Sequence, residues 1–307
     1  MFLNNPSIII APVSLGAEPT FTQSSTRLLS TLSEPEVYCD AAEEILSLER
    51  GKRLFTSAIV KSVPKTIARG ITSAGLGKPD YGQAREQHAR YVGALEACGL
   101  KVVVLDADDE FPDSVFVEDT AVVTDRCAVV VRPGAPSRRG EIRAVEPVLS
   151  DLYENVERIE APGTLDGGDV LQVGEHFYVG LTLRTNEEGA EQLSVILQRH
   201  GFDVSPVPLR RFLHLKTGVS YLGDDNLLVA GELVENDAFA GFDGIPVPPQ
   251  EEYCANCIRV NDRVLIPAGY EGTKAGISAR GYEVVEREMS EFQKVDGGLS
   301  CLSLRLP

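Results

Sequence analysis

The sequence predicts an α/β propeller built from a repeated unit of two strands, a helix and a third strand. From about residue 100 onward, β-rich runs occur in pairs, and a turn of Gly, Asp or Asn joins the two runs of each pair. Segments of helical character separate the pairs, and a short strand such as KVVVLD or YEVVE follows them. Recurrence with a period of ~20–50 residues is typical of repeat architectures.

Four paired runs and two end strands make up the expected β structure. The pairs begin near residues 114, 167, 218 and 255, with the sequences SVFVEDTAVVTDRCAVVVRPG, GGDVLQVGEHFYVGL, GVSYLGDDNLLVAGE and ANCIRVNDRVLIPAGY. RLFTSAIVKSVP is the expected first strand, and GGLSCLSLRL, from near residue 297, is the expected last strand. If the units surround one axis, the two ends of this repeat meet in one blade, which ties the last strand to the fold.

Four segments are expected to be helical: YGQAREQHARYVGALEACG, SRRGEIRAVEPVLSDLY, NEEGAEQLSVILQRHG and GTKAGISARG. In the third, the apolar residues between Ala190 and Leu197 fall on one face of a helix. Asn186 can cap its start, and Gly201 can end it.

Residues 1–54 do not fit the repeat. They offer one helical segment, DAAEEILSLERG, with polar or proline-broken sequence before it. We therefore expect two parts, an N-terminal extension over residues 1–54 that packs on the surface or is partly ordered, and a propeller domain over residues 55–307.

Composition narrows the class of protein and its partners. With 307 residues, 43% hydrophobic and 24% charged, the chain resembles an ordinary soluble globular protein. Its one N-terminal apolar run, SIIIAPVSLGA, is interrupted by Pro12 and is too short for a membrane span, so neither a secretory signal nor a membrane partner is expected. The formal charge of −17 argues against nucleic acid as a partner and is compatible with a cationic small substrate.

The six cysteines are expected to be reduced thiols, because no secretory signal precedes them, and this predicts a cytoplasmic protein. CANC, at residues 254–257, has the spacing of half a redox or zinc site. No second pair answers it, so buried thiols beside a strand are the favoured interpretation.

Cys301 and His214 are the strongest candidates for chemistry. A cysteine nucleophile needs a base and a polar surrounding, and the chain has four histidines to supply the base. Three of them have structural explanations, in a helix, in a turn and at a helix C-terminus. His214 instead lies in RFLHLKTGVSYL, where a strand-like run leads into a polar turn.

Acidic residues near two Asp-Gly-Gly turns and in FPDSVFVEDTAV are the second group of candidates. Asp166 and Asp296 open the turns in TLDGGD and VDGGLSC, which suggests backbone that approaches a shared site closely. On the expected strand, Asp113 and Asp119 share a face and Glu118 points to the other. Such carboxylates are either solvated edge charges or a site for a guanidinium group.

Seven segments in order along the chain resemble the dimethylarginine dimethylaminohydrolase family: FPDSVFVEDTAV, EAPGTLDGGDV, RTNEEGA, LHLKTGVSYL, ANCIRVN, IPAGY and DGGLSCLSLR. The likeness runs from about Phe55 to Leu306. It implies a propeller of five such units, the pentein fold. It also implies hydrolysis of asymmetric dimethylarginine or monomethylarginine to citrulline and dimethylamine or methylamine, without a metal or other cofactor.

The resemblance assigns roles to ten residues. It makes Cys301 the nucleophile that forms a thiouronium intermediate, His214 the acid and then the base, and Asp166 the carboxylate that orients the histidine. It places the substrate among seven others, which are Ile71, Asp113, Glu118, Asp119, Arg138, Arg184 and Asp296. Of these, Asp119 would bind the guanidinium, Asp113 the amino group and the two arginines the carboxylate, while Glu118 supports the site from behind.

Three other functions share parts of this pattern. Arginine deiminase uses related residues on the same fold but normally carries an extra helical domain, which is absent between Asp119 and Cys301. Amidinotransferases are longer chains with different surrounding motifs. A propeller that only binds would lack Cys301, His214 or the carboxylates, and none is lost here. The preference between methylated and unmethylated arginine and the formation of a homodimer stay open at this stage.

Overall fold

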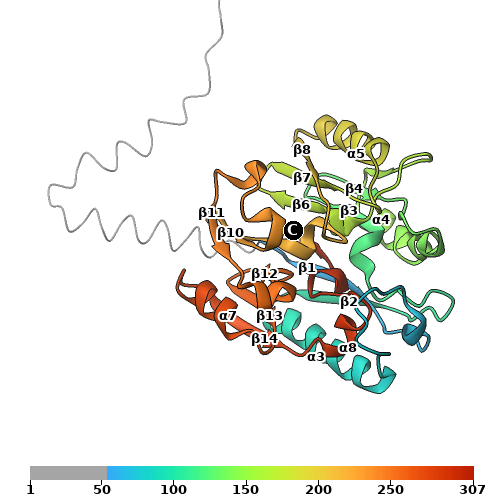
Figure 1. Cartoon of the computed structure of the whole chain (residues 1–307). Helices are drawn as coiled ribbons and strands as arrows, with labels where there is room; N and C mark the ends of the chain where they lie inside the picture. Colours follow the sequence, from blue (N-terminus) through green and yellow to red (C-terminus); the bar gives the residue numbers. More distant parts are fainter. Residues whose placement is uncertain (1–53) are drawn as a thin grey trace, which may run out of the picture. The chain divides into compact units, whose positions relative to one another are not determined.

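Five three-stranded sheets form the β structure of residues 54–307, the part of the chain that the computed structural model describes (Figure 1). The expected extension, including its helix, lies almost entirely outside these residues. The first sheet has the order β15-β1-β2, with β15 (Leu304–Leu306), β1 (Ser57–Lys61) and β2 (Lys101–Leu105). The second joins β3 (Ala121–Val123), β4 (Ala128–Val130) and β5 (Val156–Arg158), and the third joins β6 (Val170–Val173), β7 (His176–Leu181) and β8 (Asp203–Pro208). The fourth joins β9 (Val219–Gly223), β10 (Asn226–Val229) and β11 (Asp243–Pro246), and the fifth joins β12 (Ile258–Val260), β13 (Arg263–Pro267) and β14 (Glu283–Arg287).

All five sheets have the same internal order of pairing. The middle strand, which is β1, β4, β7, β10 or β13, pairs antiparallel with one neighbour and parallel with the other. A parallel neighbour requires a crossover, and helices supply it in four sheets. These are α3 (Tyr81–Ala97), α4 (Glu146–Leu152), α5 (Glu187–Arg199) and α7 (Glu271–Ser278). In the fourth sheet two 3₁₀ turns, Gly231–Leu233 and Asp237–Phe239, take the place of the helix.

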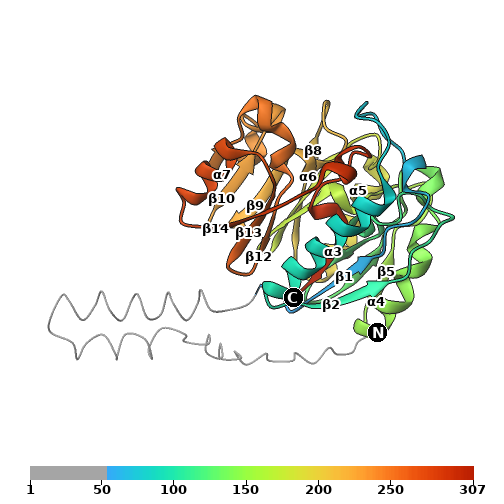
Figure 2. The same ribbon diagram turned by 90° about the horizontal axis from the view of Figure 1, so that it is seen from below.

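The helices follow from local sequence. Asn186 caps α5 as expected, because its side chain accepts a hydrogen bond from the backbone N–H of Gly189, and its buried face includes Leu193 and Leu197. Figures 1 and 2 show α3, α4, α5 and α7 outside the strands. None of the helices in the described part of the chain is both long and apolar enough to span a membrane.

The last strand joins the first sheet, as the sequence predicts. β15 pairs antiparallel with β1, with Ser57 opposite Leu306 and Ile59 opposite Leu304. The backbone N–H of Thr56 also donates to the carbonyl of Leu306, 2.9 Å away. This pairing fixes the C-terminal segment to the start of the described chain.

Four expected elements differ in detail. Residues Val117–Thr120 form a 3₁₀ turn, η2, where a strand is expected, because the hydroxyl of Thr120 donates to the carbonyl of Val117 at 2.6 Å and holds the turn. The run that follows His214 is a short helix, α6 (Leu215–Gly218), and only Glu146–Leu152 of SRRGEIRAVEPVLSDLY is α-helical. At the C-terminus, a 3₁₀ turn, η9 (Ser300–Leu302), precedes β15.

Five clusters of buried apolar side chains lie between neighbouring sheets. Each cluster draws residues from two sheets, in the pairs first and second, second and third, third and fourth, fourth and fifth, and fifth and first. The last of these contains Ala58 and Val60 of β1 together with Val260 and Leu265 of the fifth sheet. Apolar burial, the main stabilising contribution to folding, therefore connects every sheet to two others.

Candidate active site

One pocket brings together eight of the ten residues that the sequence proposes for the site. Its lining consists of Ile71, Asp113, Phe116, Asp119, Arg138, Arg184, Leu213, His214, Val295, Asp296, Gly297 and Cys301. The remaining two candidates lie next to this lining. Asp166 contacts His214 and Arg184, and Glu118 contacts Ser300, the neighbour of Cys301.

Cys301 lies in η9 with its thiol in the pocket. The side chain is buried, and its Sγ accepts a hydrogen bond from the backbone N–H of Gly298 at 3.4 Å. Burial, together with the negative charges of Glu118 and Asp119, raises the pKa of this thiol to about 12. The thiol is therefore protonated at neutral pH in this arrangement.

His214 immediately precedes α6, and its imidazole is buried against carboxylates. Nε2 lies 3.0 Å from Oδ2 of Asp166. Burial opposes the charged imidazole, but Asp119, Asp169 and Asp166 outweigh it and raise the pKa of His214 to about 9. The residue is thus protonated at neutral pH and can act as an acid.

The first Asp-Gly-Gly turn lets backbone approach the histidine closely. A Cβ at Gly168 would lie 2.8 Å from Nδ1 of His214 and 2.8 Å from Oδ1 of Asp119. Without a side chain, the N–H of Gly168 donates to that same Asp119 oxygen at 2.9 Å. Glycine is therefore required at this position by space alone.

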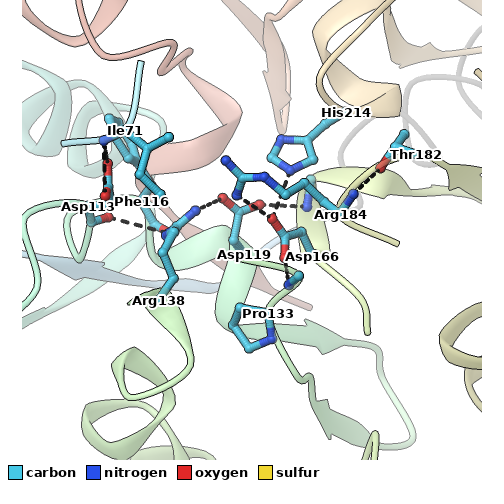
Figure 3. A network of polar contacts seen from close by, with 12 residues as sticks. Ile71, Asp113, Phe116, Asp119, Pro133, Arg138, Asp166, Thr182, Arg184 and His214 are labelled. Carbon is cyan, nitrogen blue, oxygen red and sulfur yellow. Dashed lines mark hydrogen bonds and ion pairs between the residues drawn. The ribbon is translucent and has the colours of Figure 1, made fainter. Parts of the chain in front are cut away.

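Asp119 forms a buried ion pair with Arg138. Nη1 of Arg138 donates to Oδ2 of Asp119 at 2.6 Å (Figure 3). Nε and Nη2 of Arg138 donate to the carboxylate of Glu141. Burial works against the Asp119 charge, but His214 and then Arg138 hold its pKa well below the usual range. Burial raises the pKa of Glu141 to about 7 in spite of Arg138. Asp119 is thus an ionised carboxylate that faces the pocket.

Asp166 is fully buried and accepts three hydrogen bonds. Oδ1 accepts from the backbone N–H of Gly134 at 2.8 Å. Oδ2 accepts from Nη1 of Arg184 at 3.0 Å and from Nε2 of His214 (Figure 3). The N–H of Arg184 in turn donates to the hydroxyl of Thr182, which holds this arginine at the rim of the pocket.

Two further carboxylates hold the segment that contains Ile71. Oδ1 of Asp113 accepts from the N–H of Ile71 at 3.0 Å, and Oδ2 of Asp296 accepts from the N–H of Ser73 at 2.6 Å. Burial raises the pKa of Asp113, while the side chain of Ile71 is 42% exposed. The Ile71 segment therefore borders the pocket and is attached to it through acidic side chains.

Glu118 lies behind the nucleophile, as the sequence suggests. Its oxygens accept from Nζ of Lys216 at 2.6 Å and from the hydroxyl of Ser300 at 2.7 Å, and Nη2 of Arg305 lies 3.3 Å away. In a 3₁₀ turn neighbouring side chains point in different directions. For this reason Glu118 contacts Ser300 and Lys216 behind the nucleophile, whereas Asp119 faces the pocket.

Comparison with known proteins agrees with this arrangement. Residues 80–298 match the family described as "N,N dimethylarginine dimethylhydrolase, eukaryotic". The N(G),N(G)-dimethylarginine dimethylaminohydrolase of Pseudomonas aeruginosa is 50% identical over 253 residues, which cover 82% of this chain and 100% of that one. The chain belongs to the dimethylarginine dimethylaminohydrolase family. The enzyme of the same name from Streptomyces coelicolor is 38% identical over 81% of this chain and 96% of its own.

Solved structures of the dimethylarginine dimethylaminohydrolase family share the fold. The Pseudomonas aeruginosa enzyme, as a cysteine-to-serine mutant in complex with citrulline, superimposes with a TM-score of 0.81 at 49% identity and covers 82% of this chain and 99% of that one. The N-terminal domain of ArgZ, an arginine dihydrolase from cyanobacteria, has a TM-score of 0.73 at 20% identity, over 81% of this chain and 97% of that one. At that identity the likeness extends to the fold alone.

Three side chains of the site lie close enough together to bind a metal ion, but two arginines already pair with their carboxylates. One ligand atom each from Asp119, Asp166 and His214 lies within 4.8 Å of the others. However, the guanidinium groups of Arg138 and Arg184 donate to these carboxylates. A divalent cation would have to displace both positive charges, so the donor set fits a bound guanidinium better than a metal.

The CANC segment does not contribute thiols to the site. Cys254 and Cys257 are buried beside β12, and burial raises the pKa of the Cys254 thiol far above its usual range and that of the Cys257 thiol to about 12. They are the buried thiols expected from the sequence. Four lining residues, Phe116, Leu213, Val295 and Gly297, carry no chemical signal in the sequence, although Phe116 and Gly297 fall within motifs that carry the resemblance.

Proposed function

We propose that this protein hydrolyses Nω-methylated arginine to citrulline and releases dimethylamine or methylamine. The observation that carries the proposal is the pocket in which Cys301 and protonated His214 share walls with ionised Asp119. The 50% identity with the Pseudomonas aeruginosa enzyme and the citrulline bound in its structure support the same reaction class.

The substrate is proposed to bind through charge pairs at its two ends. Asp119 and Asp166 receive the guanidinium, whose planar donors match carboxylate oxygens, and Asp113 receives the amino group. Arg184 then leaves Asp166 and binds the substrate carboxylate with Arg138. The side chain of Arg184 has room for this rotation because it is 13% exposed at the pocket rim. Ile71 and Asp296 complete the wall around the amino-acid end, and Glu118 supports the Cys301 turn.

Entry of the cationic substrate is proposed to activate the thiol. The negative charges of Glu118 and Asp119 add to burial in raising the thiol pKa, and the guanidinium offsets them. Cys301 then loses its proton to solvent, and its sulfur attacks the guanidinium carbon. Protonated His214 gives its proton to the departing amine as the C–N bond breaks, which leaves a thiouronium.

Neutral His214 is proposed to complete the cycle with water. It takes a proton from a water molecule as the oxygen attacks the thiouronium carbon, and the C–S bond then breaks. Citrulline leaves, and the Cys301 thiolate regains a proton. Asp166 accepts from His214 throughout, so it orients the imidazole in both steps. The proposal requires no metal or organic cofactor.

We also propose that the five sheets close into a propeller. The five apolar clusters connect the sheets in sequence and return from the fifth to the first, which is the pattern that a closed ring requires. The pairing of β15 with β1 then completes one blade from both ends of the described chain. We take residues 55–307 as the catalytic domain of a cytoplasmic protein.

The test is citrulline release from asymmetric dimethylarginine and, separately, from arginine. Release from the methylated substrate that Cys301→Ser abolishes is the expected result. Cys98→Ser is the matched control, because Cys98 is buried at the end of α3 and does not line the pocket. Equal or greater release from arginine would assign the chain to the deiminases, and no release from either substrate would leave a binding protein.

A further inference from the structure

Asn256 connects the segment that carries the nucleophile to the segment that carries the histidine. Its Oδ1 accepts from the backbone N–H of Ser300 at 2.9 Å, and its Nδ2 donates to the hydroxyl of Ser300 at 3.1 Å. The same Nδ2 donates to the carbonyl of Lys216 at 3.0 Å, in the helix that begins just after His214. One buried amide therefore contacts the neighbour of Cys301 and the α6 helix.

The orientation of the amide is fixed by its partners. Ser300 donates its hydroxyl proton to Glu118 at 2.7 Å, so that hydroxyl accepts from Asn256. The Lys216 carbonyl can only accept, and the Ser300 N–H can only donate. The second Asp-Gly-Gly turn fits against the amide, since a Cβ at Gly298 would lie 2.4 Å from the Asn256 side-chain carbon.

The segment that holds Asn256 is itself anchored. The hydroxyl of Ser220, in β9, donates to the carbonyls of Ala255 and Cys257 at 2.8 and 3.0 Å, on either side of Asn256. The hydroxyl of Tyr253 donates to the carbonyl of Gly297 at 2.8 Å. The CANC segment thus fixes the Cys301 turn, residues 297–301, from the fifth unit of the fold.

We propose that Asn256 is a positioning residue, which holds the Cys301 turn in register with the His214 helix for nucleophilic attack. The inference rests on the proposed function, because it concerns the two residues assigned to that reaction. Asn256 does not line the pocket and therefore does not bind substrate. Its loss changes the distance between nucleophile and acid while leaving the charged groups around the substrate in place.

The expected effect is a loss of kcat without a change in KM. A misplacement of reacting groups by about 1 Å lowers a rate by ~10²-fold. Asn256→Ala should therefore reduce kcat about 10²-fold and leave KM within about twofold. Asn256→Asp keeps the shape of the side chain, so this variant should fold. It places an oxygen against the Lys216 carbonyl, which can only accept, so kcat should fall by a similar factor.

Asn226→Ala is the matched control. Asn226 is similarly buried, and it also makes three hydrogen bonds, to the carbonyls of Gly223 and Asp224 and from Arg280. It begins β10 and has no contact with the pocket lining. An equal fall in kcat in Asn226→Ala would show that general destabilisation explains the effect and would overturn the proposal.

A double-mutant cycle with Ser300→Ala tests the route of the effect. If Asn256 acts through Ser300, the double variant loses less than the product of the two single losses. Independent, multiplicative losses would contradict the proposed link.

Amide hydrogen exchange over residues 298–302 separates the two proposals. The Ser300 N–H loses its acceptor in Asn256→Ala, so exchange in this segment should become faster than in wild type and in Asn226→Ala. If the wild type releases no citrulline, the proposed function fails, and exchange alone decides the structural link. Unchanged exchange, unchanged kcat or a rise in KM alone would each overturn the role of Asn256.

Discussion

The imidazole of His214 lies among three buried carboxylates, those of Asp119, Asp166 and Asp169. They raise its pKa to about 9, although burial by itself would lower it. Asp169 supports the arrangement through the backbone, because its Oδ1 accepts from the N–H of Leu215 at 2.9 Å. The pKa of His214, the acid in the proposed reaction, is thus determined by carboxylates from two other segments of the chain.

Replacing Asp166 with Asn should lower kcat and move the pH profile. The substitution removes one of the negative charges that raise the pKa of His214, so the imidazole loses its proton at a lower pH. The alkaline limb of kcat should shift toward lower pH, with a fall of about 10²-fold at the optimum. Glu157→Gln is the control, since Glu157 pairs with His200 outside the pocket. An alkaline limb that stays in place would contradict the role of Asp166.

The raised pKa of His214 also predicts how stability depends on pH. In the unfolded chain a histidine titrates near ~6.5, and in the folded protein this one titrates at about 9. Its stabilising contribution is therefore complete below about pH 6.5 and is lost as pH rises through about 9. The free energy of unfolding of wild type, minus that of His214→Gln, should shrink over this range in urea titrations.

His88 provides a control of opposite sign. Burial lowers its pKa to about 4, so its contribution rises between about pH 4 and 6.5 and is constant above that. The corresponding difference for His88→Gln should thus be flat where that for His214→Gln changes. A flat difference for both variants would show that His214 is neutral in the folded protein.

At the scale of elements, the site depends on β15, a strand of three residues. Only Ser303 separates it from η9, and its Leu304 and Leu306 are buried in the apolar cluster between the first and second sheets. Removing residues 304–307 exposes the edge of β1 and leaves the Cys301 turn without its C-terminal attachment. Loss of two buried leucines should lower the free energy of unfolding by about 3–6 kcal/mol. Urea denaturation measures that loss, and citrulline release should disappear with it.

Two single substitutions serve as comparisons for this truncation of β15. Leu304→Ala alone should cost about 2–5 kcal/mol, because it leaves a cavity in a packed region. Leu183→Ala, at a side chain that is fully exposed beside the pocket rim, should leave the free energy of unfolding unchanged. Equal stability of all three variants would show that β15 does not contribute to the fold.

The order of elements could be predicted from the sequence, but two short segments could not. Turn residues between β-rich runs indicated each antiparallel pair, and helical periodicity indicated α3, α5 and α7. The sequence predicts strand for Val117–Thr120, which lies in a β-rich run, and a polar turn for Leu215–Gly218, because four residues are too few to show a helical period. Their conformation depends on tertiary contacts, such as the bond from the Leu215 N–H to Asp169.

At the scale of the whole molecule, sequence indicated which residues belong to the site but not how they pair. The motif residues Cys301, His214 and Asp119 line one pocket, as the resemblance implies. The partners could not be foreseen, because Ser300 and Glu118 are 182 positions apart and meet only when the sheets assemble. Asn256 illustrates the same limit, since nothing in CANC distinguishes a positioning amide from a surface one.

The last prediction follows from the net charge of the chain. A charge of −17 produces a negative field that concentrates a cationic substrate, and the proposed substrate carries a net charge of +1 because its guanidinium and amino groups outnumber its carboxylate. Salt shortens the range of that field, from ~30 Å at about 0.01 M to less than ~8 Å at about 0.5 M. The value of kcat/KM for asymmetric dimethylarginine should therefore fall several-fold over this range, while kcat changes little.

Citrulline provides the control for this salt dependence. It has the same amino and carboxylate groups but no net charge, so its inhibition constant should respond to salt much less than kcat/KM does. The two measurements together separate the field of the whole molecule from the local pairs with Asp113, Arg138 and Arg184, which both ligands share. If citrulline inhibition weakened as much as kcat/KM, salt would be acting on those local pairs, and the overall charge would have no part in drawing the substrate to the pocket.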